Sequence, residues 1–449
     1  MSASPPRELL MIAFYFPPAG VVGVYRTLKF ARYLPEFGWA PRVLTTSNGR
    51  FPTYDASLLA LVPEGLPVHR CAGFELFNEG LSRPATKPRA RPLASRIHTR
   101  LYLAWHWLAL PDTNVGWVPS AFVHALRLVR REDIRDVYIS GFPFSSFLIG
   151  ALLKAFARVN VTIDYRDPWT QNINYPRRTA LHRRIDRALE RWVVRRSDVV
   201  VSNTRFNDER MFAEFGGGAP REKFVAIHNG FDASDFVAVS RERTDRFTIT
   251  YAGAFYYSIG STFKGRAGDE VMKTYSPLYF FEALASFFAR RPEAKGRTRV
   301  RFMGLLGHGY DPLIREHGLD AVIERIGYID YVEHLRVLKN SDVLLLVLSK
   351  GEKSRGWIPS KFLQYLGTGN PILALAPEGE VRDILRETRG GIAVDPDDVP
   401  AASRAIEGLY DDWASGTLIA RQDAAAAARY ERRYLTGRLA EALKRGKTA

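Results

Sequence analysis

The sequence predicts an α/β fold with two parallel sheets, each covered by helices. Short apolar, β-branched runs alternate with longer amphipathic stretches along the whole chain, which is the pattern of βαβ units. Twelve such runs are present, more than one compact doubly wound sheet usually holds. The 449 residues also suffice for two or three domains. Two Rossmann-like sheets are therefore the expected architecture.

Each half of the chain contributes six of the expected strands. In the first half they lie at 8–16, 41–46, 136–140, 161–165, 198–203 and 224–229. In the second half they lie at 247–253, 299–304, 322–329, 342–349, 371–376 and 391–395. Amphipathic patterns such as SFLIGALLKAFARV and YFFEALASFFARR separate the runs and predict the connecting helices.

The domain boundary is expected near 232–246, where the polar stretch AVSRERTDR separates two apolar runs. This places a first domain over 1–240 and a second over 241–418. The last segment, 419–449, contains AAAAARYERRYLTGRLAEALKR, whose residues are mostly strong helix formers. It is predicted as a separate C-terminal helix.

The composition is that of an ordinary globular protein, with 46% apolar and 25% charged residues. It excludes a disordered chain, a collagen-like fibre and a disulfide-stapled scaffold. Cys71 is the only cysteine, which excludes an intramolecular disulfide and favours a reducing compartment. The nine histidines are dispersed without HxH or HxxxH spacing, so no metal site is expected.

Neither a membrane-spanning helix nor a cleaved signal is expected. No window contains 18 uninterrupted apolar residues. The apolar run from Leu9 to Phe16 is too short for a signal peptide and ends at Pro17 and Pro18. The expected location is therefore the cytoplasm.

Positive charge is concentrated in the first half. The chain has a net charge of +16, and residues 1–240 hold 32 basic against 21 acidic side chains, a net of +11. A polyanion, a phosphate-rich ligand or an anionic membrane are the partners that this permits. The segment 83–108 contributes most, because six basic residues precede the run LYLAWHWLAL: Arg83, Lys87, Arg89, Arg91, Arg96 and Arg100.

Basic residues beside Tyr102, Trp105 and Trp107 suit contact with the interface of an anionic membrane. A basic loop followed by a core helix is the alternative. Nucleic acid is the least supported partner, because no recognised binding motif accompanies the charge.

The turn after the first strand, FPPAGVVGVYR, is a candidate ligand loop. In an open α/β sheet, ligands bind beyond the carboxyl ends of the strands. Glycines permit close approach of the backbone, and the N-terminus of the next helix favours anions. Gly20, Gly23 and Arg26 are therefore candidates for a phosphate or acceptor loop. The spacing is not GxGxxG, so a dinucleotide is not indicated, and a plain strand-to-helix turn remains the alternative.

Charged residues also follow a central strand in DYRDPW, where Asp164, Arg166 and Asp167 would hold an acceptor or a reacting phosphate. An Asp–Arg pair that braces the loop is the alternative. The turn SGFPFSS, which contains Pro143, ends the preceding strand and would line the same crevice, unless it is an ordinary turn.

In the second half, Gly253 ends a strand and a basic loop follows it. Lys264, Arg266 and Lys273 in that loop could neutralise a pyrophosphate, although a solvated insertion would look the same. A second signal is IPSKFLQYLGTGNP, in which a helix begins near Ser360. Lys361 lies in the first turn, where a cation opposes the helix dipole, so an anionic partner is indicated. Gln364 lies one turn later on the same face.

At these residues the chain resembles the glycosyltransferases of family 4, which have the GT-B fold. The resemblance extends from FYFPPAGVVGVYRTLKFARYLPEFGWAPRVLT through DYRDPW and HNGFD to MGLLGHG, IGYIDYVEHLRVLKNSDVLLL and IPSKFLQYLGTGNPILAL. It implies two facing Rossmann-like domains, the first binding an acceptor and the second a nucleotide-activated sugar. The final helix of the family usually returns to the first domain.

The resemblance further implies a retaining hexosyltransferase of the EC 2.4 class that needs no metal or other cofactor. By position, Gly20 and Gly23 correspond to the phosphate or acceptor loop, and Gly253 to the turn beside the donor pyrophosphate. Lys361 would neutralise the diphosphate, and Tyr328 would frame the nucleobase. Arg166, Asp167 and Lys361 are the predicted catalytic set, and Lys264, Arg266, Ser360 and Gln364 complete the predicted donor site.

The sequence departs from the family pattern at two places. Gln364 stands where a ribose-binding Glu is usual, and the paired Glu would fall at Gly356. Arg166 and Asp167 stand in place of a His, as in a subgroup with an RD-W pattern.

The expected function is sugar transfer to a lipid-linked or polysaccharide acceptor in cell-envelope assembly. A nucleotide-sugar 2-epimerase and a non-catalytic GT-B scaffold are the alternatives.

Overall fold

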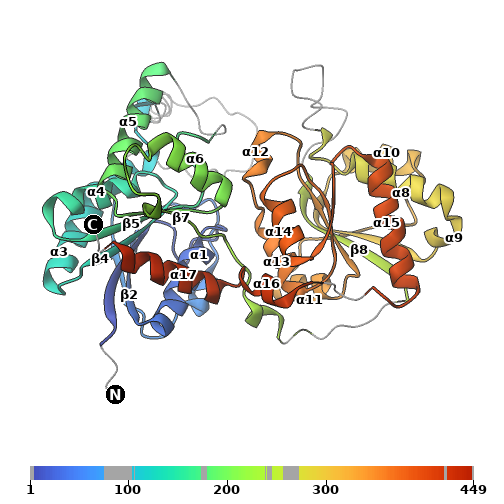
Figure 1. Cartoon of the computed structure of the whole chain (residues 1–449), viewed down its shortest axis with the longest axis horizontal. Helices are drawn as coiled ribbons and strands as arrows, with labels where there is room; N and C mark the ends of the chain where they lie inside the picture. The colour runs from blue at the N-terminus through green and yellow to red at the C-terminus, as the bar shows by residue number, and fades with distance from the viewer. Residues whose placement is uncertain are drawn as a thin grey trace, which may run out of the picture. The chain divides into compact units, whose positions relative to one another are not determined.

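The computed structural model describes residues 5–74, 104–105, 107–172, 179–237, 239, 245–255, 273–418 and 422–446 (Figure 1). The chain forms two compact units. Unit 1 comprises residues 1–228 and 432–449, and unit 2 comprises residues 229–431. These divisions differ from the expected boundaries at 240 and 419, because the chain from Asn229 onwards and the start of the C-terminal segment, up to Glu431, belong to unit 2.

Unit 1 is built on a seven-stranded parallel sheet in the order β3-β2-β1-β4-β5-β6-β7. All six strands expected in this half are present. The seventh, β3, was not expected, because its sequence VHRC is short and only partly apolar, as an edge strand tolerates. The strands are β1 Arg7–Ala13, β2 Trp39–Thr46, β3 Val68–Cys71, β4 Asp136–Gly141, β5 Asn160–Tyr165, β6 Val199–Ser202 and β7 Phe224–Ala226.

Helices cover both faces of this sheet because β1 is apolar on both sides. Leu9 and Met11 pack towards α1 and α17, whereas Leu10 and Ile12 pack towards α3, α4 and α5. Short 3-10 turns lie at Leu34–Phe37, Ala56–Leu61, Thr113–Trp117 and Arg221–Lys223. The helices of unit 1 are α1 Val24–Tyr33, α3 Val118–Arg131, α4 Ser146–Phe156, α5 Ala180–Arg196, α6 Arg205–Phe215 and α17 Arg432–Arg445.

The C-terminal segment is not one helix, as the sequence suggested, but two short ones. Helix α16 (Ala424–Ala428) stays in unit 2, and α17 packs in unit 1 against α1. The interruption falls at Tyr430, which is buried in the core of unit 2, whereas Leu435 and Leu439 are buried in unit 1. Local helix propensity is thus overridden by burial of side chains in two different cores.

Unit 2 is built on a six-stranded parallel sheet in the order β10-β9-β8-β11-β12-β13. Every strand expected in this half is present, so the parallel α/β prediction is confirmed for both units. The strands are β8 Phe247–Phe255, β9 Thr298–Leu306, β10 Ile323–Gly327, β11 Val343–Val347, β12 Ile372–Leu375 and β13 Gly391–Val394.

Helices again cover both faces of the sheet, with α8 and α15 on one side and α11, α13, α14 and α16 on the other. Short 3-10 turns lie at Ala233–Phe236 and His308–Tyr310. The further helices are α8 Leu278–Arg290, α9 Pro292–Lys295, α10 Asp311–Glu316, α11 Tyr331–Lys339, α12 Glu352–Arg355, α13 Ser360–Thr368, α14 Glu380–Thr388 and α15 Val399–Ala414.

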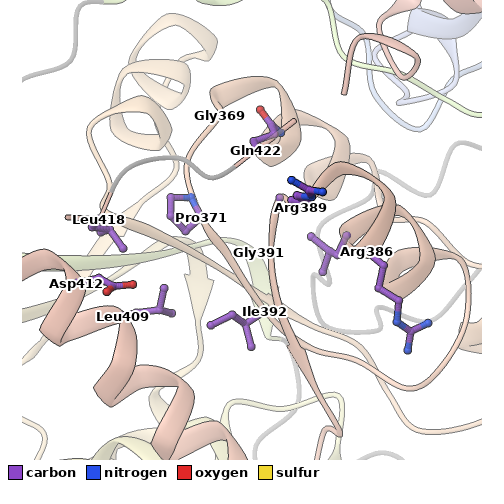
Figure 2. Close-up of a pocket in the computed structure, with 12 residues that line it drawn as sticks. Gly369, Pro371, Arg386, Arg389, Gly391, Ile392, Leu409, Asp412, Leu418 and Gln422 are labelled. Carbon is purple, nitrogen blue, oxygen red and sulfur yellow. The ribbon is translucent and has the colours of Figure 1, made fainter. Parts of the chain in front are cut away.

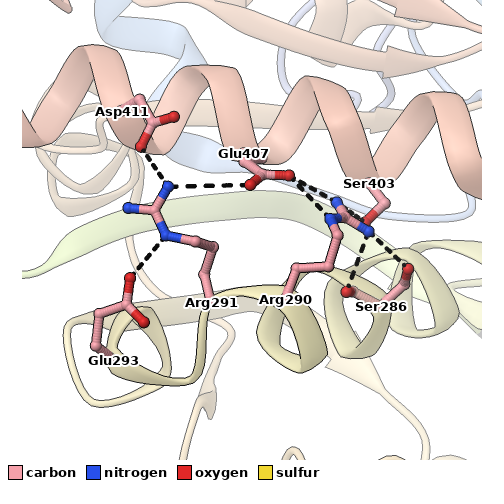
Figure 3. A network of polar contacts seen from close by, with 7 residues as sticks. All are labelled: Ser286, Arg290, Arg291, Glu293, Ser403, Glu407 and Asp411. Carbon is pink, nitrogen blue, oxygen red and sulfur yellow. Dashed lines mark hydrogen bonds and ion pairs between the residues drawn. The ribbon is translucent and has the colours of Figure 1, made fainter.

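A polar network joins α8 to α15 at the surface of unit 2 (Figure 3). Arg290 donates to Glu407 at 2.8 Å and to Ser403 at 3.0 Å, and Arg291 pairs with Glu293 and Asp411. Because these pairs are largely exposed, water screens them and each adds little to stability. The network thus links α8 to α15 through side chains at the surface of unit 2.

Both sheets reverse their strand order beside one central strand, β1 in unit 1 and β8 in unit 2. Loops at the carboxyl ends of such strands leave a crevice in which ligands bind. Among the described residues, no helix has both the length and the apolar character to cross a membrane.

Candidate functional site

In unit 1, the structure brings together two predicted site residues from distant parts of the chain. Gly23 is the residue before α1, and the guanidinium of Arg166, which follows β5, lies directly against it. A Cβ atom at position 23 would stand 1.6 Å from Arg166 Nη1. A side chain at position 23 would therefore have to displace the end of the Arg166 side chain from the space it occupies.

The guanidinium of Arg166 is a cation with no hydrogen-bond or ion-pair partner among the described residues, whereas the backbone carbonyl of Arg166 accepts a hydrogen bond from Asn203. Burial lowers the pKa of its guanidinium, while the neighbouring Asp167 carboxylate favours the charged form. An arginine stays charged throughout the physiological pH range. The side chain thus offers a planar positive charge at the carboxyl edge of the sheet, beside the start of α1.

Arg26 has a different surrounding from the one expected for a ligand loop. It is only 3% exposed and makes a two-point ion pair with Asp164, which is fully buried, at 2.7 and 3.0 Å. It also donates to the backbone carbonyls of Ile227 and His228, both at 2.9 Å. The Asp–Arg pair left open by the sequence therefore joins Asp164 to Arg26, and Arg166 is left out of it.

The close approach at Gly20 likewise comes from the chain itself. Gly20 N donates to Thr53 O at 2.8 Å, and a Cβ at this position would lie 3.1 Å from Asp55 Cβ. The β1–α1 loop is thus held against the segment that follows β2. Close packing explains this glycine without a ligand.

The turn that contains Pro143 is held by a residue that the sequence analysis did not select. Asp112 accepts hydrogen bonds from Ser145 N at 2.9 Å and Ser145 Oγ at 2.8 Å. Burial raises the pKa of this carboxyl, whereas the Ser145 hydrogen bonds oppose that shift. Asp112 therefore positions the turn at the end of β4, and Pro143 is buried within it. No local sequence signal marked this pairing, because the partners are 33 residues apart.

In unit 2, the predicted diphosphate residues Gly253 and Lys361 are in contact. Gly253, near the end of β8, has φ +138°, and a Cβ there would lie 2.4 Å from Lys361 Nζ. Gly304 is its partner on β9, and a Cβ at Gly304 would lie 2.3 Å from Gly253 O. Gly253 thus makes room for the lysine at the carboxyl edge, and Gly304 makes room for the backbone of Gly253. The role of Gly304 was missed, although it lies in MGLLGHG.

The ammonium of Lys361 has a neutral partner and no carboxylate partner among the described residues. Its Nζ donates to Tyr251 Oη at 2.8 Å and lies 4.1 Å from the centroid of the Tyr251 ring. Burial lowers the pKa of Lys361 to about 7. Helix α13 begins at the exposed Ser360, with no side chain capping its first turn. An anion here would meet both the ammonium and the start of the helix.

Gln364 also has a described partner. Its Oε1 lies 3.3 Å from Nε2 of His334 on α11, and burial lowers the pKa of this histidine, so the ring is neutral at pH 7. Tyr328, in the turn between β10 and α11, is 77% exposed. The side-chain carbonyl of Gln364 thus accepts a hydrogen bond from His334, whose ring carries its proton on Nε2 in this contact.

Some predicted residues lie outside the described part of the chain. These are Lys264, Arg266 and most of the segment 83–108. Within the described residues, no group of three or more His, Cys, Asp and Glu side chains could hold a metal ion.

A cavity of about 360 Å³ lies in unit 2 away from these residues (Figure 2). Pro371 precedes β12 and Gly391 begins β13, so the cavity adjoins the amino-terminal ends of these strands. Gly253 and Lys361 lie at the carboxyl edge instead. The cavity is therefore not part of the candidate site.

Comparison with known proteins places this geometry in a family context. Residues 23–230 match the sequence model described as a glycosyl transferase 4-like domain. No curated protein matches the sequence. Solved structures that are similar over nearly the whole chain include three at 12–14% identity.

A glycosyltransferase from Rickettsia africae ESF-5 has 12% identity and a TM-score of 0.58, covering 99% of this chain and 100% of that one. Anabaena Alr3699/HepE in complex with UDP has 14% identity and a TM-score of 0.57, covering 98% and 99%. UDP-GlcNAc 2-epimerase from Methanocaldococcus jannaschii has 12% identity and a TM-score of 0.51, covering 97% and 99%. The GT-B fold expected from the sequence is confirmed.

Substituting Gly253 by alanine tests the contact between the glycine turn and Lys361. We expect Gly253→Ala to lower the free energy of unfolding by about 1–3 kcal/mol, because φ +138° is strained for any residue with a Cβ. It should also displace Lys361 and weaken the binding of an anion at this edge of the sheet. Chemical denaturation and calorimetry measure the two effects.

Gly416→Ala is the matched control, since Gly416 has φ +72° but open space around its Cβ position. It should lose stability and keep the affinity for that anion. Equal affinities in Gly253→Ala and the parent protein would contradict the assignment of this turn.

Proposed function

We propose that this protein is a retaining glycosyltransferase of the EC 2.4 class. It moves a sugar from a nucleotide-diphosphate sugar to a hydroxyl of a lipid-linked or polysaccharide acceptor in cell-envelope assembly. The observation that carries the proposal is the Lys361 ammonium, which lies against Gly253 with Tyr251 as its neutral partner. The glycosyl transferase 4-like match over 23–230 and the UDP complex of a fold neighbour agree with it.

The chemistry follows from where charge develops. The bond between the anomeric carbon and the diphosphate breaks, and negative charge accumulates on the leaving oxygen. A fixed ammonium beside that oxygen stabilises the transition state more than the ground state. The acceptor oxygen bonds to the same face of the anomeric carbon, and its proton passes to the departing diphosphate. Arg166 and Asp167 would orient the acceptor in unit 1.

One assay distinguishes the proposed transferase from a 2-epimerase and from a binding scaffold. Incubation with a panel of nucleotide sugars and lipid-linked or saccharide acceptors, followed by mass spectrometry, should yield a glycosylated acceptor and free nucleotide diphosphate. An isomerised donor without transfer would support the 2-epimerase alternative, which the epimerase among the fold neighbours keeps open. A folded protein without turnover would support a binding scaffold. Transfer should not require added metal or cofactor.

We expect affinity for the nucleotide sugar to fall as the pH rises above about 7. Below this value Lys361 is already an ammonium in the free protein, because its pKa is lowered to about 7. Above it, binding an anion must raise that pKa and take up a proton. The dissociation constant should then rise by up to about tenfold per pH unit, until the pH reaches the pKa in the complex.

Calorimetry between about pH 6 and pH 9 measures this dependence. Lys361→Met should bind more weakly and show a flat profile. A parent protein with pH-independent affinity would contradict the placement of Lys361 beside the diphosphate.

We also propose that unit 1 contacts an anionic membrane on its cytoplasmic side, where a lipid-linked acceptor would be found. Of the segment 83–108, Trp107 and Leu108 are described and exposed. Trp107 packs against His182 near the start of α5, a helix with six exposed arginines whose two acidic residues are buried. Exposed apolar and basic side chains together suit a lipid interface. Flotation with anionic and neutral vesicles tests the contact.

A further inference from the structure

A row of aromatic rings crosses the carboxyl edge of the sheet in unit 1. We call Tyr54, Phe51, Tyr15 and Phe142 the aromatic row. Neighbouring ring centroids along it are 5.3, 5.7 and 6.2 Å apart. Its members follow β2, β1 and β4, which are adjacent in the sheet in that order. The row therefore exists only because the strands are arranged side by side.

The row is partly open to solvent and supported from within. Phe142 is 38% exposed and Tyr54 is 60% exposed, while Tyr15 is partly exposed. Phe144 packs edge-on against Phe142 at 5.4 Å, and Trp169 stacks on Phe144 at 5.3 Å with an interplanar angle of 5°. Because buried rings support the exposed ones, little side-chain entropy should be lost when a ligand binds to this surface.

Charge lies next to this surface. The Arg166 guanidinium, which packs on Gly23, acts electrostatically on the Tyr15 hydroxyl. Burial, with the Asp112 carboxyl as the second cause, raises the pKa of Tyr15 to about 12, so its hydroxyl stays protonated at neutral pH. The exposed carboxylate of Asp167 is adjacent to Arg166 in the chain. A cation and a hydroxyl thus adjoin the exposed rings, and a carboxylate follows the cation in the chain.

We propose that this combination selects an anionic saccharide as the acceptor. The sugar ring would stack on Tyr15 and Phe142, and its phosphate or carboxylate would pair with Arg166. The negative face of an aromatic ring attracts the positively polarised C–H groups of a sugar, and Arg is suited to a two-point contact with an anion. Hydroxyls of the sugar would meet Tyr15 and Asp167. The proposal rests on the proposed function, because it names that reaction's acceptor class.

A hydrocarbon chain fits the same surface less well. Large exposed apolar patches mark lipid-binding surfaces, whereas this row is interrupted by polar atoms. The Tyr54 hydroxyl donates to Gly49 O at 2.9 Å, and Tyr15 carries its hydroxyl beside Arg166. A hydroxylated ring can form hydrogen bonds with the Tyr15 hydroxyl, and an isoprenoid chain cannot.

Fragment binding to the full-length protein tests the inference by ligand-observed NMR. The probes are glucose 1-phosphate, inorganic phosphate, methyl α-glucopyranoside and geranyl phosphate. We expect glucose 1-phosphate to bind more tightly than either of its two halves. Phe142→Ala should weaken it about fivefold, the factor that corresponds to losing one aromatic contact of about 1 kcal/mol. Phe142→Trp, which keeps an aromatic face, should retain most of the affinity.

Phe156→Ala is the matched control, because Phe156 is also an exposed phenylalanine of unit 1 but ends α4. It should leave the affinity for glucose 1-phosphate unchanged. Three results would overturn the inference: no preference for glucose 1-phosphate over inorganic phosphate, equal loss in both alanine variants, or dependence on Phe142 for geranyl phosphate alone.

The transfer assay separates this inference from the proposed function. If transfer occurs, and Phe142→Ala changes neither sugar-phosphate affinity nor the KM for the acceptor, only the acceptor assignment fails. If no nucleotide sugar binds or reacts, the proposed function fails, and Phe142-dependent fragment binding would still be measurable.

Discussion

Replacing Lys361 by alanine is expected to lower kcat/KM for sugar transfer by about 100- to 1000-fold, or about 2.7–4 kcal/mol of transition-state stabilisation. The ammonium is fixed by its hydrogen bond to Tyr251 and by its packing against Gly253. It therefore needs little reorganisation as charge develops on the diphosphate. Most of the loss should fall on kcat, because the charge on the leaving oxygen is largest in the transition state.

Two further variants sharpen this test. Tyr251→Phe removes the hydroxyl that orients Lys361 but keeps the ring beneath the ammonium, so its effect should be smaller than that of Lys361→Ala. Lys361→Met removes a buried charge together with its desolvation cost, so it should not destabilise the fold. Thermal unfolding measures this. Unchanged kinetics in a folded Lys361→Ala protein would reject the role of this residue.

Replacing Arg26 by alanine is expected to lower the free energy of unfolding by about 3–5 kcal/mol, as for other buried ion pairs that lose one partner. The substitution leaves the buried Asp164 carboxylate without its ion-pair partner, although Tyr138 still donates to it. It also removes the hydrogen bonds that Arg26 donates to the backbone carbonyls of Ile227 and His228, which follow β7. Denaturant unfolding measures the change.

Arg166→Ala is the informative comparison, since it removes an arginine from the same region. The Arg166 guanidinium has no hydrogen-bond partner among the described residues, and the bond from Asn203 to the Arg166 carbonyl does not involve the side chain, so stability should change by less than about 1 kcal/mol. Acceptor-dependent activity should fall instead. Equal destabilisation by the two substitutions would contradict the division of roles between a structural Arg26 and a functional Arg166.

Prediction from the sequence succeeded where the signal is local. Buried parallel strands are continuous apolar runs, so all six expected strands of each half are present. Within the part of the chain that the structure describes, β3, with the short sequence VHRC, is the one strand that was missed. Glycine followed by a helix likewise marked Gly23, and Lys361 was marked by its place in the first turn of α13. Such patterns depend on residues within a few positions of one another.

The C-terminal segment shows the limit of local signals. Its composition favours one long helix, yet it forms α16 and α17 because Tyr430 and Leu435 are buried in different cores. The alanine-rich sequence specifies that a helix is possible but does not specify in which unit its side chains are buried.

By itself, the sequence determined the parallel α/β architecture of both halves, the glycine turns at their carboxyl edges and the cations beside them. Only the tertiary structure decided which partner each charge has. Arg26 and Asp164 are 138 residues apart, and Lys361 and Tyr251 are 110 apart. The aromatic row likewise unites rings that follow three separate strands. Such contacts depend on strand order and register. Parallel strands are joined by long crossover connections, so a pattern of neighbouring residues does not reveal which strands lie side by side.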